Sequence, residues 1–352
     1  MDNINFLQKK ELFSLNTLKC LRNEYFFNEC DLCFSRCSEM ALGLQKEKIK
    51  LFENRCIECG DCIGICPTQA LNLENFDTEE FILNFINTQK STILEKVDIP
   101  SFGMLDSHHL LTIIIRKKEN LYLEYDEACK NLEYLKQIQK QTNNFLQSIN
   151  FKYKVELKKH IDELNIENKI RRNLFKTIFE NKKQLQKETS VSNNLKIKNN
   201  ETISKLILLK NSIKSIIEEV ENIELSTLDS TLLFNKQIDF NSCTNCLDCI
   251  NFCPTNALFQ NEKKDSIYFQ AGKCIGCNIC DDICKEKAIS NKEKINLIDF
   301  TFDKASKLVE FTYKTCQECN SVFIYKNGDI ICPRCKDFRD NHSSMFTLAK
   351  DF

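Results

Sequence analysis

The chain has 352 residues, of which 42% are hydrophobic and 28% charged, and its formal net charge is −1. A charge balance this close to zero argues against a polyanionic partner, so no nucleic acid is expected. The longest apolar runs, near Leu110–Ile115 and Leu206–Leu209, are far shorter than the ~20 residues needed to cross a bilayer, so no membrane span is expected.

The 21 cysteines are the unusual feature of this composition. The N-terminal run MDNINFLQKKELFSL lacks a basic segment followed by an apolar core, so it does not resemble a secretory signal, and a cytoplasmic location is expected. A reducing cytosol keeps thiols free, which indicates that the cysteines are ligands rather than disulfide partners. All but Cys129 fall into five groups of four: Cys20, Cys30, Cys33, Cys37; Cys56, Cys59, Cys62, Cys66; Cys243, Cys246, Cys249, Cys253; Cys274, Cys277, Cys280, Cys284; and Cys316, Cys319, Cys332, Cys335.

An internal repeat accompanies the first four groups. Four residues after the last cysteine of each group comes an alanine, followed by an apolar residue; the alanines are Ala41, Ala70, Ala257 and Ala288. Each unit therefore reads as a cysteine-bearing loop, a short turn and the start of an apolar element. The units occur in two pairs, at residues 14–75 and 236–298, which we interpret as two modules.

Residues 76–160, between the pairs, show a different pattern. Asp77 and Glu80 form a capping box for a helix over 78–88. The predicted elements that follow are a strand at 92–99 ending at Pro100, a helix at 107–118, a strand at 121–125, a helix at 132–149 and a strand at 152–157. Strands that alternate with helices of this length predict a small parallel α/β unit.

A helical spacer is predicted over residues 161–235. Its first part, 161–185, has a helical pattern, and the polar stretch 186–202 is typical of a linker. A heptad-like stripe then predicts one more helix, formed by Leu206, Leu209, Ile213, Ile216, Val220 and Ile223. The stripe is too short to indicate a coiled coil by itself. We therefore favour packing within this chain over a partner helix.

Three of the cysteine groups have the spacing C-x2-C-x2-C-x3-C: those beginning at Cys56, Cys243 and Cys274. Proline follows the first two, as Pro67 and Pro254, and Lys285 replaces it in the third. This is the bacterial ferredoxin spacing, in which the fourth cysteine binds the neighbouring cluster. Three thiolates on a tight loop wrap one cubane, and the following turn carries the fourth to the other. Soft thiolates also favour iron–sulfur clusters over Mg or Ca.

The crossover rule assigns the second pair directly. One [4Fe–4S] cluster is predicted at Cys243, Cys246, Cys249 and Cys284, and the other at Cys274, Cys277, Cys280 and Cys253.

The first pair is irregular, because Phe27 stands where regular spacing would place a cysteine. Residues 14–75 and 236–298 resemble two-cluster bacterial ferredoxins, and polyferredoxin-like chains carry a first motif of the shape seen here, a lone C-x-R (Cys20-Leu21-Arg22) ahead of C-x2-C-x3-C. The resemblance implies one cluster at Cys20, Cys30, Cys33 and Cys66 and another at Cys56, Cys59, Cys62 and Cys37. The alternative is a degenerate first site that is empty or holds a three-iron cluster.

The last group consists of two C-x2-C knuckles, Cys316/Cys319 and Cys332/Cys335, at residues 310–340. Phe323, Tyr325 and Gly328 between them indicate a hairpin. Two knuckles around one tetrahedral ion form a zinc-ribbon-like site that is closed and structural. A rubredoxin-like iron is the alternative at these four cysteines.

Residues 76–160 resemble an α/β module of multi-cluster proteins encoded with anaerobic formate dehydrogenases, hydrogenases and heterodisulfide-reductase-like complexes. The resemblance rests on Ile99-Pro100-Ser101-Phe102-Gly103 followed by a helix, and on a strand ending near Cys129. Related modules carry a cysteine where Ser101 stands and a second one near Cys129. The absence of that pair implies a scaffold rather than a redox site, and the lone Cys129 is interpreted as a buried thiol.

For His108 and His109, which have no metal-spaced partner, we expect solvent or capping roles.

The predicted fold class is α+β: two ferredoxin-like two-cluster modules flanking a small α/β and helical spacer, with a C-terminal zinc-ribbon-like hairpin. The predicted function is electron transfer through [4Fe–4S] clusters to or from redox partner proteins, for which the resemblance suggests a formate dehydrogenase- or hydrogenase-like complex. We expect a carrier or electron-transfer subunit rather than an enzyme, because the sequence has no radical-SAM loop and no Gly-rich dinucleotide fingerprint. Two alternatives are a redox enzyme component with an unrecognised substrate or flavin site, and an assembly or regulatory protein that uses the zinc ribbon.

Overall fold

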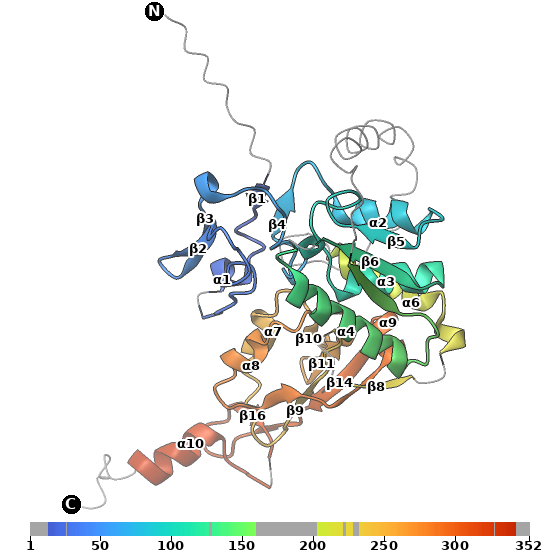
Figure 1. Ribbon diagram of the computed structural model, residues 1–352. Helices are drawn as coiled ribbons and strands as arrows, with labels where there is room; N and C mark the ends of the chain where they lie inside the picture. Colours follow the sequence, from blue (N-terminus) through green and yellow to red (C-terminus); the bar gives the residue numbers. More distant parts are fainter. Residues whose placement is uncertain are drawn as a thin grey trace, which may run out of the picture.

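The computed structural model describes residues 13–25, 27–126, 129–159, 203–220, 223–227, 232–326 and 328–342. Figure 1 shows three parts: an N-terminal module, an α/β module beside it, and a C-terminal module below both, from which the last helix projects. Among the helices of these described ranges, none has the length and apolar character that crossing a membrane requires.

The N-terminal module is built from two antiparallel strand pairs. Strand β1 (Phe13–Leu15) precedes the first cysteine motif and pairs with β4 (Leu71–Leu73), which follows the second. Between the motifs, β2 (Leu42–Gln45) and β3 (Lys48–Leu51) form a hairpin. The short helix α1 (Leu21–Glu24) begins directly after Cys20 and lies against β3.

The C-terminal module repeats this topology. Strand β9 (Lys236–Ile238) pairs with β12 (Ile289–Asn291), and β10 (Leu258–Gln260) forms a hairpin with β11 (Ser266–Gln270). The same order of strands around the motifs in both modules gives the sequence repeat a structural counterpart.

Further elements enlarge the C-terminal module. The outer edge of the β10–β11 hairpin is covered by β14 (Ala305–Glu310), and β8 (Glu224–Ser226) pairs with β13 (Lys294–Asn296). The helices of this part are α7 (Asp248–Asn251), α8 (Ile279–Ile283) and α9 (Leu297–Thr301).

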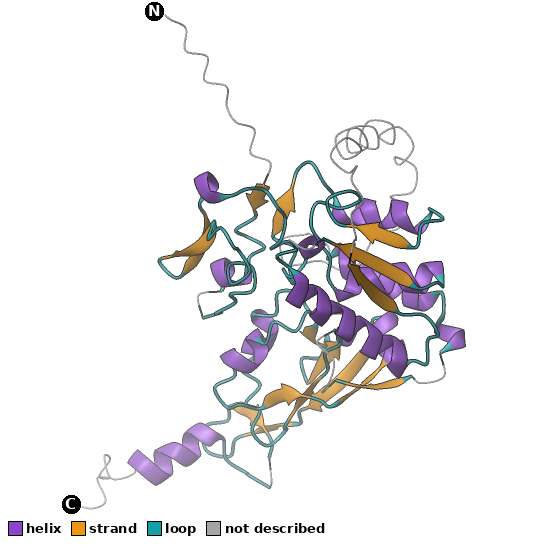
Figure 2. Cartoon of the chain, viewed as in Figure 1, coloured by secondary structure: helices purple, strands orange, loops and turns teal. Residues whose placement is uncertain are grey.

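The α/β module has a three-stranded parallel sheet, as predicted, in the order β5 (Thr92–Leu94), β6 (Leu121–Tyr125) and β7 (Val155–Lys159). Its helices α2 (Thr78–Ile86), α3 (Ser107–Lys117) and α4 (Leu132–Ser148) lie beside these strands in Figure 2. Asp77 caps α2 by accepting from the N–H of Glu80, as the sequence indicates.

Strand β5 is shorter than the predicted 92–99. It ends at Leu94 because the chain turns there: the N–H of Asp98 donates to the carbonyl of Leu94, and the Asp98 carboxylate accepts from the N–H of Leu94. Lys96, inside this turn, has a left-handed φ of 64°. The 92–99 pattern therefore combines a short strand with a tight turn.

Helix α6 (Ser204–Lys214) joins the α/β module to the C-terminal module. Its Lys205 ammonium lies 2.7 Å from Asp106 at the start of α3, and its Lys210 ammonium lies 2.7 Å from Asp303 after α9. Both lysine side chains are buried, and a buried charge requires such a partner. Five of the six residues of the predicted apolar stripe are buried as expected, and Ile223 is half-buried.

The single helix predicted for that stripe, however, is too long. Helix α6 ends at Lys214, and Ile216 and Val220 reach the core from a following 3-10 turn, Ile217–Glu219, and its flanks. Side-chain hydroxyls compete with helical hydrogen bonds near this end, since Ser212 donates to the Leu208 carbonyl and Ser215 donates to the Ser212 carbonyl. The segments 161–185 and 186–202, predicted as helical and as a linker, lie outside the described residues.

The α/β module docks on the N-terminal module through close backbone contact. The N–H of Gly64, between two cysteines, donates to the carbonyl of Gly103 over 2.9 Å. A Cβ atom at Gly103 would lie 2.5 Å from the Cα of Asp61, which leaves room only for glycine. Side chains continue the contact, because Ser101 and Asn131 both donate hydrogen bonds to the buried carboxylate of Asp61.

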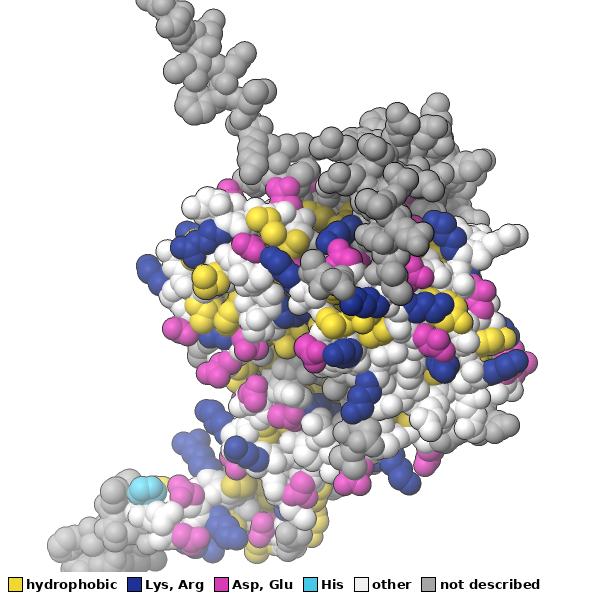
Figure 3. All heavy atoms as spheres, viewed as in Figure 1, with side chains coloured by type: hydrophobic (Ala, Val, Ile, Leu, Met, Phe, Trp, Pro, Cys, Tyr) yellow, Lys and Arg dark blue, Asp and Glu magenta, His cyan; other side chains and the backbone are white. Residues whose placement is uncertain are grey.

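The surface carries both signs of charge. On the face drawn in Figure 3, Lys and Arg side chains lie interspersed with Asp and Glu side chains over all three parts. This distribution matches the near-zero net charge of the sequence.

Gly103→Ala should destabilise the docking of the α/β module, because the added methyl group meets the Asp61 backbone rather than a flexible side chain. We expect a loss of about 1–3 kcal/mol in the free energy of unfolding, measured by denaturant titration of the reconstituted protein. Gly43→Ala is the matched control, since its methyl would meet the movable Phe52 ring at 3.1 Å. Equal unfolding midpoints for the two variants would contradict the docking role of Gly103.

Candidate iron–sulfur and zinc sites

The three regular cysteine loops share one backbone conformation. In each, the residues on both sides of the second cysteine have a positive φ: Glu58 and Gly60, Asn245 and Leu247, and Gly276 and Asn278. Two left-handed residues around one cysteine curl the chain tightly enough to turn three thiols toward a common centre. In the irregular first motif, neither neighbour of Cys30 has this conformation.

The repeated alanine also has a structural role. In all four motifs the residue three positions after the fourth cysteine has a positive φ: Met40, Gln69, Asn256 and Lys287. The following alanine is buried in each case, at Ala41, Ala70, Ala257 and Ala288. In three of them its N–H donates to the Sγ of the fourth cysteine, as between Ala41 and Cys37 at 3.2 Å. The small alanine side chain at this position therefore allows its backbone N–H to donate a hydrogen bond to the ligand sulfur.

In the N-terminal module the cysteines converge on two neighbouring cavities, named here sites A and B. Site A is lined by Cys37, Cys56, Cys59 and Cys62, and site B is lined by Cys20, Cys30, Cys33 and Cys66. Each set takes its fourth cysteine from the other motif, the arrangement expected from the crossover rule and, for Cys20, from the resemblance.

In the C-terminal module, site D is a cavity of about 150 Å³ lined by Cys243, Cys246, Cys249 and Cys284. The remaining four cysteines, Cys253, Cys274, Cys277 and Cys280, make up site C. Their thiols lie close enough to affect one another's ionisation: Cys253 and Cys274 both raise the pKa of Cys277, after burial, to about 12.

The thiol groups at these sites can bind as thiolates only together with a metal cation. Burial raises the pKa of Cys249 to about 12, and the thiolates of the other three site D cysteines add to that rise. Burial likewise raises the pKa of Cys62 in site A, and the Cys33 thiolate of neighbouring site B contributes. With pKa values raised in this way the free cysteines hold their protons, and four of them around one cavity become thiolates only when a bound cation replaces those protons, as iron does in an iron–sulfur cluster. The donor set therefore fits iron–sulfur clusters.

Three lysines contact these sites, and the cysteine spacing predicts none of them. At site B, Lys205 donates to the carbonyls of Gly64 and Cys66, at 3.2 and 2.9 Å. At site C, the almost fully buried Lys236 pairs with Asp281, the neighbour of Cys280. At site D, Lys326 donates to the carbonyl of Cys243 at 2.8 Å. A lone lysine at an apolar position was the available signal for Lys205 and Lys236.

The α/β module adds a polar network rather than a ligand to site A. Asp61, between Cys59 and Cys62, accepts hydrogen bonds from Ser101 and Asn131. Arg36, directly before Cys37, donates to Asn131 at 2.7 Å. Ser101 thus occupies a docking position.

The remaining polar candidates also have structural neighbours. The thiol of Cys129 is half-buried beside the Glu95 carboxylate, so it is not the simple core residue expected. His109 takes part in a capping box with Asp106 at the start of α3. His108 lies 3.1 Å from Asp106.

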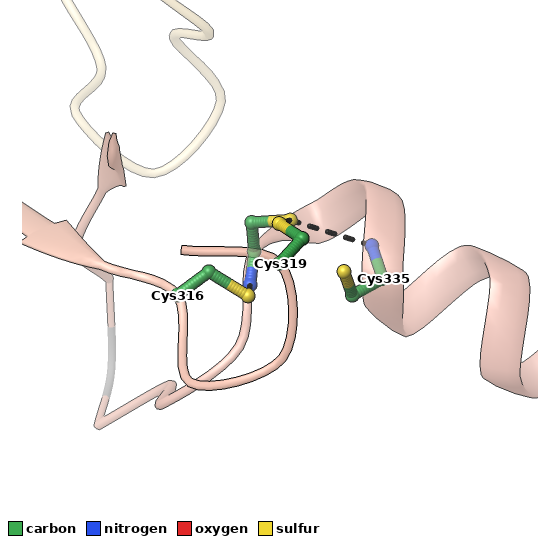
Figure 4. Close-up of side chains that lie close together, drawn as sticks. Cys316, Cys319 and Cys335 are labelled. Carbon is green, nitrogen blue, oxygen red and sulfur yellow. Dashed lines mark hydrogen bonds between the residues drawn. The ribbon is translucent and has the colours of Figure 1, made fainter. Parts of the chain in front are cut away.

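The C-terminal knuckles form a tighter group than sites A to D. Strands β15 (Tyr313–Thr315) and β16 (Val322–Ile324) form a hairpin around the first knuckle, and Cys332 caps α10 (Pro333–Asp337), which contains Cys335. The four Sγ atoms lie within 4.8 Å of one another. The side chains of Cys316, Cys319 and Cys335 converge in Figure 4.

These distances suit a single ion. Zn–S bonds of about 2.3 Å in a tetrahedron place sulfurs roughly 3.8 Å apart, and the Sγ atoms of Cys319 and Cys332 lie 3.7 Å apart. Although burial opposes it, backbone N–H groups around the sulfur lower the pKa of Cys316 to about 6, so this thiol is ready to bind as thiolate.

The ribbon, residues 313–335, packs directly on site D. Besides the Lys326 contact, the side chain of Asn245 in the site D loop donates to the hydroxyl of Tyr313 at 3.0 Å. Phe240, just before the loop, stacks on Phe311, just before the ribbon, with ring centroids 6.0 Å apart. The fifth cysteine group is thus attached to the second cluster pair.

Comparison with protein families finds iron–sulfur domains in both modules. Residues 235–285 match a model of the 4Fe-4S dicluster domain, and residues 49–72 match a model of the 4Fe-4S binding domain. The matched ranges contain the three regular motifs and leave out the irregular one.

Curated relatives match over short segments. The chain is 38% identical over 48 residues, 14% of its length, to the archaeal-type glutamate synthase [NADPH] of Thermotoga maritima and to that of Thermotoga sp. strain RQ2. It is 36% identical over 61 residues, 16% of its length, to the ferredoxin-type protein NapH of Haemophilus influenzae. The chain spans only 10% of the synthases and 21% of the ferredoxin-type protein.

These matches define the class of protein. The chain carries ferredoxin-type 4Fe–4S regions, and these regions support iron–sulfur electron transfer. The two regions, with the similarity to a ferredoxin-type protein, support a polyferredoxin-like family.

Cys20→Ser should remove about four irons per chain, as Cys30→Ser should, because both thiols line site B. Iron analysis after anaerobic reconstitution and the EPR spectrum of the reduced protein measure the loss. Cys129→Ser, at the cysteine outside the five groups, is the control and should keep all its iron. Unchanged iron in the Cys20 variant would mean that site B is degenerate.

Cys332→Ser should release zinc and loosen the C-terminal ribbon while the iron content stays the same, since a closed zinc site stabilises its surroundings locally. Metal analysis and limited proteolysis of the ribbon measure the two effects. If iron is lost together with zinc, the fifth group is not an independent site.

Proposed function

We propose that the chain relays electrons between redox partner proteins through four [4Fe–4S] clusters, one at each of sites A to D. The observation that carries this proposal is the convergence of sixteen cysteines into four sets of four, in which each set is completed by the neighbouring motif. Sets crossed in this way keep the two sites of a module adjacent.

When bound, a [4Fe–4S] cluster takes up and releases a single electron. The protein's part is to hold the sites at fixed separations and to set their electrostatics. Buried Lys236 beside site C and Lys326 at site D favour added negative charge, whereas the buried carboxylate of Asp61 beside site A opposes it. Such differences bias the distribution of electrons along the chain.

Exposed residues at sites A and D suit these two sites to exchange with partners. Cys246 of site D is exposed, and so are Ile57 and Met40 in the loops of site A. The partners proposed are redox proteins, among them a formate dehydrogenase- or hydrogenase-like complex, on the resemblance of residues 76–160. The proposed setting is the cytoplasm of an anaerobically growing cell, because ligand thiols must stay reduced.

The proposed role of the ribbon is to hold one zinc ion at Cys316, Cys319, Cys332 and Cys335. A rubredoxin-like iron would use the same four thiolates. The contacts of the ribbon with Asn245 and Cys243 support a role for the ribbon in fixing the site D loop.

A second candidate is a redox enzyme component, and one observation favours it. A cavity of about 370 Å³ lies beside the Ile63–Gly64 stretch of the site A and B loops and is lined by buried His109 and Lys205 together with Glu79. A flavin absorption spectrum, or turnover of a small substrate without a partner protein or dye, would decide for this candidate against the relay.

The relay predicts about 16 irons per chain (4 × 4), with one zinc, after anaerobic reconstitution. Metal analysis combined with stepwise reduction tests it, and magnetic coupling within each module is expected as neighbouring sites fill with electrons. A plateau near eight irons would exclude four clusters.

A further inference from the structure

The irregular first motif carries two half-buried aromatic side chains, Tyr25 and Phe27. Helix α1 follows Cys20, and the chain then turns, because the N–H of Asn28 donates to the carbonyl of Tyr25 at 2.9 Å. The buried Asn28 side chain in turn accepts from the N–H of Cys30 at 3.1 Å. The turn is therefore fixed between two site B ligands, with Tyr25 and Phe27 on it.

These two rings contact the other ferredoxin module. The ring of Phe27 lies 5.4 Å from that of Phe252, edge to face, and the ring of Tyr25 lies 6.3 Å from it. Phe252 directly precedes Cys253, a member of site C. Helix α1, which ends just before Tyr25, and helix α7, which ends just before Phe252, lie near each other in Figure 1. The position that lacks the expected cysteine thus makes a contact between modules.

Helix α6 makes a second connection between the same two sites. Its Lys205 donates to the carbonyl of Cys66, a member of site B. Its Ile203, Leu206 and Ile207 side chains pack with Ile275, the residue after Cys274 of site C. Two independent contacts therefore join ligand loops of site B to ligand loops of site C.

The electrostatics of Tyr25 agree with this closeness. Burial raises the pKa of its phenol to about 12, and the negative charges of Glu24, Cys253 and Cys277 add to the effect. Two site C thiolates thus act on a side chain of the site B loop.

We propose that Tyr25, Phe27 and Phe252, together with the first turn of α6, hold sites B and C side by side as the crossing point for electrons between the modules. The inference rests on the proposed function and adds an order, A–B–C–D, to the relay. In the crossing step one electron leaves a reduced cluster at one of the middle sites and reaches an oxidised cluster at the other. No bond forms or breaks.

The test isolates the two middle sites. The double variant Cys59→Ser/Cys246→Ser removes one ligand each from sites A and D and leaves B and C intact. After anaerobic reconstitution and reduction with dithionite, its EPR spectrum should show spin–spin broadening that arises between modules. Two unperturbed, additive signals would overturn the proposal. Iron below two clusters would instead contradict the cluster assignments of the proposed function.

The aromatic contact is tested in the same background. Phe27→Ala/Phe252→Ala should weaken the broadening at least twofold at unchanged iron content. The matched control is Phe259→Ala, which removes a half-buried ring that stacks on Tyr268 within the C-terminal module. If the control and the ring variants give equal broadening, the rings do not hold the crossing point.

A second measurement covers the case in which the outer-site variants fail to fold. The same ring variants, made in the otherwise unaltered chain, should have narrower EPR lines in the fully reduced protein than the Phe259→Ala control. An identical spectrum there would also overturn the proposal.

Discussion

Crowding of buried thiolates is the constraint on which the rest of the structure depends. Burial and neighbouring sulfurs together raise the pKa of cysteines such as Cys249 and Cys277 to about 12, so the thiolate forms that bind metal are favoured there only when bound iron supplies positive charge. The surrounding features serve this requirement: left-handed residues that curl the loops, alanine N–H groups that donate to the fourth sulfur, and lysines at three of the four sites. The structure of the modules is therefore determined more by their metal-binding cysteines than by an apolar core.

The α/β module and α6 provide the rigidity that short cysteine loops lack. Backbone contact between Gly64 and Gly103 fixes the loop of sites A and B against a sheet-and-helix body. Helix α6 then links that body to the C-terminal module through Lys205 and Lys210, each neutralised by an aspartate. The segment between the two modules thus acts as a frame that brings them into contact, in line with the packing within this chain that the apolar stripe favours.

The sequence was most informative where the chemistry depends on spacing. Cysteine spacing predicts which thiols line site D, whereas the sets at sites A and B were predicted through the resemblance. Apolar periodicity predicts α3, β6 and α4 nearly to the residue, because this pattern is local. The sequence did not predict the roles of residues that depend on contacts between distant parts of the chain. Lys205, Asp61 and Phe252 read as unremarkable residues, and their roles arise only from partners far along the chain. The early end of β5 was missed because a side-chain turn at Asp98 interrupts a pattern that fits a longer strand.

The two modules share one strand order, yet they use equivalent positions differently. The residue directly before the last cysteine of the first motif is Arg36 in one module and Phe252 in the other. Arg36 stacks on Tyr134 of the α/β module, 3.4 Å from its ring centre, and Phe252 packs on Tyr25 and Phe27. Related modules joined head to tail through repeated surfaces would go on adding copies into an open filament. Because Arg36 and Phe252 differ at this equivalent position, the surface by which the C-terminal module meets the first motif is not repeated on the N-terminal module.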